Sequence, residues 1–412
     1  LITLVNRDMN KKVKIFSLLF GSMVAISSSI LAISTLNSCS SSKEVNGVSA
    51  RILDSNVQGG KFSFKILENN KVDITKVDEL IAPSGLDFNG GKFKYNDVEY
   101  QISDISASFT NNNSSIEREL TIPKTVERIG DWAFSNCSKI TEINFNEGIQ
   151  TIGSHAFSET TNVINTPIFP KTLKEIRNYA FEGSSIAGDI TLSENITKLG
   201  EAAFKNCNAI KRIIFNNKLT YIDKCTCMDM NELEAVEIPT SITEIKESAF
   251  SNCPKLKDFD FNGGKIEKIG TKAFWHCTGI EHLVFNSEIK LIGDNAFEGC
   301  SSIASVDFNN GIKTIGDAAF KDCTGLLYVE DNPLVIVPSI ESIGAHAFEG
   351  CRSISHISIS NREKILPYKS NMFEATYVTK IIVSDQETKE KYNNDNNWKS
   401  NPDLLAKITV NE

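Results

Sequence analysis

The sequence predicts a β-rich solenoid, in which short repeats stack on one another around one continuous core. A phrase built around Phe returns every 23 or 24 residues, and a run of alternating apolar and polar residues follows it each time. Phe is also abundant, at 24 residues against 3 Trp and 5 Met, as expected if it fills one recurring position. A fixed period in this range is the mark of a repeat architecture. We expect about eleven repeats over residues 116–375.

The repeated phrase is Ile-Gly-x-x-Ala-Phe-x-x-Cys, as seen for example at residues 129–137, 292–300 and 315–323. The final steps are longer, at 28 and 25 residues, and an insertion at residues 331–335 accounts for the first of them. The Phe position of successive repeats holds Phe134, Phe157, Phe181, Phe204, Cys227, Phe250, Phe274, Phe297, Phe320, Phe348 and Phe373. A period of 23 lies in the leucine-rich-repeat range and outside the ankyrin and tetratricopeptide ranges.

The apolar positions of each repeat predict which side chains point inward. Ile140, Ile143 and Phe145 follow the first phrase with the alternation of a strand that has one buried face. In each repeat a polar turn comes next, then a pair such as Val126 and Ile129, and Ala-Phe closes the circuit. One buried Phe contributes only about 1.5–3 kcal/mol. Stability must therefore come from contacts between stacked neighbours.

Segments on both sides of the array predict caps, which a solenoid needs to cover its exposed ends. Residues 51–115 predict a small β-rich N-terminal cap, with a strand at 61–66 and a hairpin over 92–102 that turns at Asn96-Asp97. Residues 376–412 predict an α/β C-terminal cap. There, Ile381–Val383, Tyr392, Trp398 and Leu404-Leu405 suggest a final strand, a short helix and a closing strand.

The first 38 residues predict a secretory signal peptide. Basic residues after Met9 precede a long uncharged, largely apolar stretch. Leu36-Asn37-Ser38-Cys39 resembles a bacterial lipobox, which implies cleavage before Cys39, lipid on its sulfur, and a flexible linker over 39–50. The alternative is an uncleaved anchor, since about 20 apolar residues can span a bilayer. Either interpretation places the remaining chain at the extracellular face of the cell membrane.

The phrase and its following strand resemble the BspA-type leucine-rich-repeat family of surface proteins, over residues 116–375. The resemblance implies a non-enzymatic adhesin, or a module that binds extracellular host or cell-surface proteins. The alternative function is an anchored enzyme or an accessory subunit of a surface transport complex. The net charge of −9 disfavours nucleic acid as a partner, because phosphate recognition requires a basic surface.

The candidate ligand face is a run of outward-pointing acids on the strands. It comprises Glu237, Asp258, Asp260, Asp307 and Glu330, and His282 and Val284 interrupt it. Such a run is either a solvated surface or a docking stripe for a basic protein segment or calcium. Neighbouring carboxylates repel one another unless a cation lies on them.

Neither catalytic residues nor a cofactor or metal site is expected. Seven cysteines share one repeat position with Thr160, Ser184, Met230 and Thr376, so we interpret them as small buried residues. The pair Cys225 and Cys227 could chelate a metal or join a disulfide, but Cys227 holds the Phe position of its repeat, so we interpret the pair as structural. His276, Cys277 and His282 superficially suggest zinc, but Cys277 should lie inside and fewer than four ligands converge.

Overall fold

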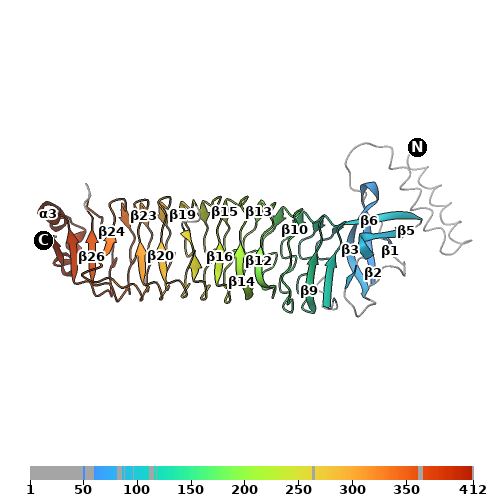
Figure 1. Ribbon diagram of the computed structural model, residues 1–412, viewed down its shortest axis with the longest axis horizontal. Coiled ribbons are helices and arrows are strands. Elements are labelled where there is room, and N and C mark those ends of the chain that lie inside the picture. Colours follow the sequence, from blue (N-terminus) through green and yellow to red (C-terminus); the bar gives the residue numbers. More distant parts are fainter. Residues whose placement is uncertain are drawn as a thin grey trace, which may run out of the picture.

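The protein is an elongated rod of stacked rungs, with a small cap at each end (Figure 1). This computed structural model describes residues 50–51, 60–80, 86–87, 89–95, 97–110, 116, 118–261, 265–360 and 365–410. The solenoid has about 13 turns and mostly parallel strands, which confirms the predicted fold class. The number of turns exceeds the number of copies of the repeated phrase, because segments of both caps add turns to the stack.

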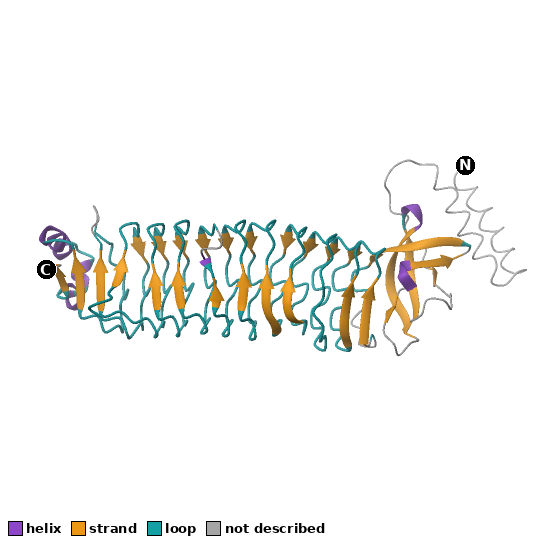
Figure 2. Ribbon diagram, in the orientation of Figure 1, coloured by secondary structure: helices purple, strands orange, loops and turns teal. Residues whose placement is uncertain are grey.

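Each rung crosses two walls, and longer strands form the first, which we call the strand wall (Figure 2). Its strands pair in parallel within four short sheets, and the sheets follow one another along the rod. They are β4 (Leu86–Asp87), β7 (Arg118–Ile122), β9 (Ile140–Phe145), β12 (Ala187–Thr191), β14 (Ala209–Ile214), β16 (Ala235–Glu237), β18 (Asp258–Phe259), β20 (His282–Val284), β22 (Ser305–Asp307), β24 (Leu334–Ile336), β26 (His356–Ile359), β27 (Lys380–Val383) and β28 (Ile408–Val410).

Two-residue strands form the opposite wall, called here the back wall. Each ends in the buried apolar residue that precedes the Gly position of the phrase, as Ile292 does in β21. They are β8 (Arg128–Ile129), β10 (Thr151–Ile152), β11 (Glu175–Ile176), β13 (Lys198–Leu199), β15 (Tyr221–Ile222), β17 (Glu244–Ile245), β19 (Lys268–Ile269), β21 (Leu291–Ile292), β23 (Thr314–Ile315) and β25 (Ser342–Ile343).

The Phe position builds a ladder of rings through the core. Consecutive rings stack with centroids 5.2–5.6 Å apart, on either side of the gap left by Cys227. Phe297 is fully buried between Phe274 and Phe320, at 5.2 and 5.3 Å. The predicted inward side chains of the strand wall, such as Ile140 and Ile143, are also buried. The core is therefore one continuous column.

The corner between the two walls contains the phrase itself and has an unusual backbone. The residue two before Phe and the residue two after it both have positive φ, as at Asn295 (56°) and Gly299 (75°). Their N–H groups, and that of Phe297 between them, donate to carbonyls of the next rung at 2.8 Å. The left-handed conformation explains why Asn, Asp and Gly recur after Phe.

The strand wall is interrupted between β9 and β12, where one rung has no strand. Here the side chain of Asn165 replaces the missing backbone partner of β9. Its Oδ1 accepts from the Ile143 N–H at 3.0 Å, and its Nδ2 donates to the Ile143 carbonyl at 2.9 Å. The rung exposes Ile164 and Ile168 strongly, at 73% and 82%.

The N-terminal cap is hydrogen-bonded directly to the back wall. β1 (Ala50–Arg51), β2 (Gly60–Ile66) and β3 (Lys71–Leu80) lead to β6 (Val98–Ile105), which pairs in parallel with β8. β5 (Lys92–Tyr95) forms an antiparallel hairpin with β6, as the sequence predicts. Two 3-10 turns, η1 (Glu68–Asn70) and η2 (Asn89–Gly91), join these strands. The stack therefore already includes the end of β6, before residue 116.

The C-terminal cap closes the other end with α3 (Gln386–Asn394), η4 (Trp398–Ser400), α4 (Pro402–Leu405) and β28. Trp398 is fully buried, and its Nε1 donates to the Leu366 carbonyl at 2.8 Å. The expectation of a closing strand at Leu404-Leu405 was wrong in position. Asn401 caps a helical turn there, with Pro402 as its first residue, and the strand follows at 408–410.

The predicted signal peptide (1–38), Cys39 and most of the linker lie outside the described residues. Within the part of the chain that the structure describes, no helix has the length and apolarity to cross a membrane.

Candidate functional site

The strand wall carries the acidic residues that the sequence singles out. The register places Val236 beside Phe259 and Val284 beside Asp307. Glu237 and Asp260, the residues directly after Val236 and Phe259, therefore lie side by side in one outward-facing column. Val284 and Asp307 continue this column along the rod. Asp258 lies beside Ala235 in the other outward column, and its side chain is not described. The candidate ligand face is thus two columns and not one.

Cations of the same chain lie on this face. Arg212 Nη1 is 3.1 Å from Glu237 Oε1, across neighbouring rungs. Lys380 Nζ is 3.9 Å from Glu330 Oε1, near the C-terminal end. The long insertion places Glu330 in a turn rather than in a strand. Repulsion along the acidic run is therefore reduced at both of its ends, and these pairs are exposed enough to contribute little to stability.

The same wall exposes a group of large apolar side chains around β22. Val284 is 50% exposed and is paired in register with Asp307. On the other side, Leu327 (57% exposed) donates its N–H to the Ala304 carbonyl, and Val329 is 43% exposed. We call Val284, Asp307, Leu327 and Val329 the β22 patch. Sequence reasoning placed Val284 outward but missed Leu327 and Val329, because in the longer rung after Phe320 it is Tyr328 that points inward.

The corner presents a second set of chemical groups at its outward positions. His155 and His346 occupy the same repeat position, two before Phe, and both are partly exposed. His155 is stacked between Trp132 and Tyr179, with centroids 3.7 and 4.8 Å away. Burial lowers the pKa of His155, although the nearby carboxylates of Glu182 and Asp131 act in the opposite direction.

His346 lies in a different environment, at the C-terminal end of the corner. Its Nδ1 forms a short contact with Glu349 Oε2, and Glu349 Oε1 pairs with Lys321 Nζ at 3.0 Å. Burial alone would raise the pKa of Glu349, but Lys321 and His346 lower it overall. Glu374 of the next rung brings a second carboxylate. We call His346, Glu349 and Glu374 the corner cluster.

The cysteines of the repeat position are buried, as expected. Each thiol from Cys277 on donates to the backbone carbonyl of the Phe position one rung earlier, as Cys300 Sγ does to Phe274 at 3.0 Å. Burial raises the pKa of the Cys300 and Cys351 thiols to about 12. The position therefore accepts small hydrogen-bond donors, which explains why Ser and Thr replace Cys.

The other cysteine and histidine groups also follow the structural interpretation. All nine described cysteines are free thiols, and among them only Cys225 is partly exposed. Cys277 points into the core and donates to Phe250 at 3.0 Å. His282 instead lies exposed on the strand wall, where Nδ1 is 3.0 Å from Ser305 Oγ.

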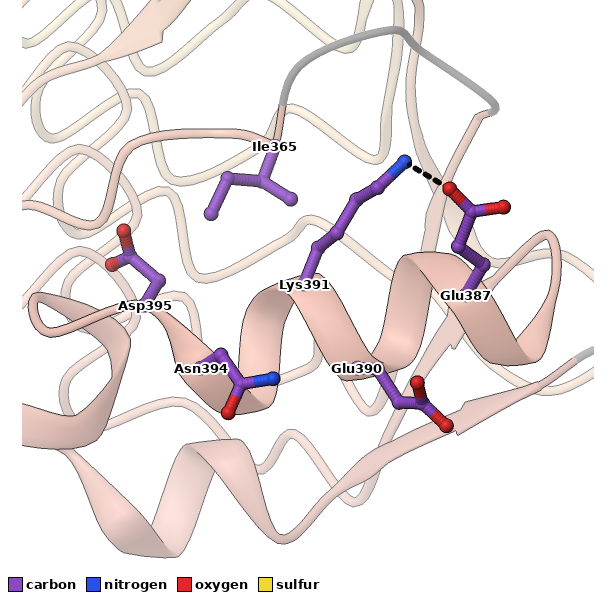
Figure 3. A pocket seen from close by; sticks show the side chains of 6 residues that line it. All are labelled: Ile365, Glu387, Glu390, Lys391, Asn394 and Asp395. Atoms are coloured by element: carbon purple, nitrogen blue, oxygen red, sulfur yellow. Dashed lines mark ion pairs between the residues drawn. The ribbon is translucent and has the colours of Figure 1, made fainter.

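An open hollow of about 620 Å³ lies beside α3 in the C-terminal cap (Figure 3). Ile365, Glu387, Glu390, Lys391, Asn394 and Asp395 line it. Lys391 Nζ pairs with Glu387 Oε1 at 2.8 Å, one helical turn away, and that carboxylate raises the pKa of Lys391. The lining is thus mainly the outer side of a short helix, with the groups of an ordinary solvated surface.

Comparisons with known proteins agree with this architecture. A leucine-rich repeat protein from Bacteroides ovatus is 21% identical, with a TM-score of 0.51, and the alignment covers 85% of this chain and 98% of that one. A leucine-rich cell surface protein from Faecalibacterium prausnitzii is 20% identical, with a TM-score of 0.52 and the same coverage. At these identities the likeness shows the fold alone. A search of curated proteins gave no match.

A family match covers most of the chain. The BspA type leucine rich repeat region is found in six copies, over residues 103–230, 222–333 and 328–399. These ranges contain both walls, the corner and the helix of the C-terminal cap. The chain therefore belongs to the BspA-type leucine-rich-repeat family.

Proposed function

We propose that the protein is a non-enzymatic adhesin that is anchored at the cell surface by lipid on Cys39 and binds extracellular host or cell-surface proteins through its strand wall. The fold is consistent with protein binding, and leucine-rich-repeat proteins generally mediate such contacts. The anchor rests on the sequence Leu36-Asn37-Ser38-Cys39.

The β22 patch is the observation that carries the proposal. Three large apolar side chains that are 43–57% exposed lie with one exposed carboxylate on three neighbouring rungs of the strand wall. A mixed apolar and charged surface of this kind suits a protein partner, because apolar contacts supply affinity and charges supply orientation. Asp260 and Glu330 extend the acidic character along the rod, so the expected partner segment is basic and partly apolar.

The test compares binding of the purified protein to host cells, matrix proteins and bacterial surfaces. Leu327→Ser with Val329→Ser should lower binding about tenfold or more, as expected for residues at the centre of an interface. Ile164→Ser with Ile168→Ser is the matched control, since these residues are even more exposed but lie at the interrupted rung. Equal binding by both double variants would refute the assignment of the β22 patch.

Charge provides a second arm of the test. Asp260→Lys with Asp307→Lys should weaken binding, and most strongly at low salt, because salt screens exposed charges. Glu267→Lys with Glu288→Lys on the back-wall side changes the net charge equally and should have little effect. If the swap on the strand wall leaves binding unchanged at low and high salt while the fold persists, the acidic columns are only solvated surface.

A further inference from the structure

We propose that the corner cluster binds a divalent transition metal of the Zn²⁺ type. His346, Glu349 and Glu374 each offer one ligand atom, and these atoms all lie within 4.8 Å of one another. No other group of three His, Cys, Asp or Glu side chains in the described part of the chain is brought together in this way.

The stacking of rungs fixes the geometry of these ligands. His346 and Glu349 belong to one rung, where the Glu349 N–H donates to the His346 carbonyl at 3.0 Å. Glu374 belongs to the next rung, and its carbonyl accepts from the Gly350 N–H at 2.9 Å. Because parallel rungs keep their spacing, the backbone of the third ligand is held beside the first two before any metal arrives. Glu374 is exposed and can rotate to close the remaining distance.

The donor set selects the class of metal. One imidazole nitrogen and two carboxylate oxygens suit Zn²⁺ and its neighbours, whereas Ca²⁺ and Mg²⁺ prefer oxygen ligands alone. Three protein ligands would leave a coordination position open for water or for a group from a partner.

Lys321 places a positive charge beside the proposed cation site, on one of its ligands. Its Nζ is 3.0 Å from Glu349 Oε1, while Oε2 of the same carboxylate faces His346. The ammonium therefore occupies one carboxylate oxygen and leaves the other, which faces His346, as the metal ligand. Its charge also opposes a bound cation, so it limits the affinity.

The chain contains an incomplete copy of the same arrangement. His155 occupies the repeat position of His346, and Glu182 occupies that of Glu374, with 3.9 Å between His155 Nδ1 and Glu182 Oε2. Ser158, however, stands where the complete cluster has Glu349. The copy offers only two of the three ligands, and its histidine is covered by aromatic rings. His155 therefore serves as a control within the same molecule.

The experiment is a calorimetric titration of the metal-free full chain, purified in detergent without a histidine tag, with ZnCl₂. Every sample carries Cys39→Ser and Cys225→Ser, so that these two thiols do not compete for zinc. The reference protein should bind one equivalent, and Co²⁺ in its place should give a visible absorption band. His346→Gln and Glu374→Gln should each weaken binding about tenfold or more, since even partners of metal ligands contribute 10–100-fold. His155→Gln should bind as the reference does.

Two further arms separate a metal site from a merely structural ion pair. Lys321→Met should strengthen zinc binding several-fold, because it removes the opposing charge, and CaCl₂ at equal concentration should not compete. Circular dichroism confirms that each variant is folded. The proposal is overturned if the reference protein binds no zinc, if Glu374→Gln binds as tightly as the reference, if His155→Gln loses as much affinity as His346→Gln, or if Lys321→Met weakens binding.

Discussion

The imidazole of His155 lies flat on the indole of Trp132, with ring centroids 3.7 Å apart and planes inclined by 11°. Tyr179 covers the other side of the imidazole at 4.8 Å and 3°. The three residues occupy the same position in consecutive repeats, and each has a positive φ. The stack therefore shields an ionisable ring on an otherwise solvated corner.

This shielding predicts a dependence of stability on pH. The pKa of His155 is lowered in the folded state, chiefly by burial, relative to about 6.5 in the unfolded chain. The unfolded state therefore binds the proton more readily, so the contribution to stability is full above about pH 6.5 and is lost as pH falls through the folded pKa. His155→Phe should remove this loss, since the position already accepts Trp and Tyr. Melting temperatures from pH 7.5 to 5 would test this, and identical pH slopes for both proteins would contradict it.

Phe297→Ala should destabilise the rod by about 3–5 kcal/mol, because a large ring between two others leaves a cavity that the stack cannot close. Damage should spread to neighbouring rungs, since each depends on contacts with the next. Asp294→Ala in the same repeat is the control and should cost about 1 kcal/mol, because Asp294 Oδ1 accepts from the Asp317 N–H at 2.8 Å. Urea unfolding measures both changes, and equal midpoints for the two variants would disprove the role of the Phe ladder.

Asn165→Ala should cost about 1–3 kcal/mol, because it leaves both backbone groups of Ile143 without their side-chain partner at the interrupted rung. Asn162→Ala is a matched change in the same rung. Asn162 is exposed and makes one bond of 2.7 Å, to the Ser138 carbonyl, so its loss should cost clearly less. Hydrogen exchange at the Ile143 amide should rise in the first variant only. Unchanged exchange there would show that Asn165 does not replace a strand.

Cys225 should be the one thiol of the described repeats that alkylating reagents modify quickly in the folded state. The other eight described cysteines are buried, and burial raises the pKa of most of them strongly. Burial, Glu201 and Glu247 also raise the pKa of Cys225, so its labelling should accelerate as the pH becomes alkaline. Mass spectrometry of a Cys39→Ser protein treated with iodoacetamide would count the modified thiols. Rapid labelling of several cysteines would mean that the rungs open readily.

The sequence alone determined the repeat, the inward positions and the presence of caps. These features follow from local chemistry, because each rung needs an apolar side chain at the same height on every wall. The Phe position and the hairpin of β5 and β6 were therefore predictable from spacing and alternation. The same reasoning located outward acids of the strand wall.

Only the tertiary structure decided which outward side chains meet. The rungs differ in length by several residues, so contacts between them depend on register and side-chain direction, which spacing does not specify. Thus the pairing of Glu237 with Arg212 and the replacement of a strand by Asn165 emerged from the stack. The corner cluster did so too, although its signal was present: Glu349 and Glu374 each follow the Phe of successive repeats. Their proximity to His346 required the positive φ of the corner and the parallel spacing of the rungs, which are properties of the folded array and not of any single repeat.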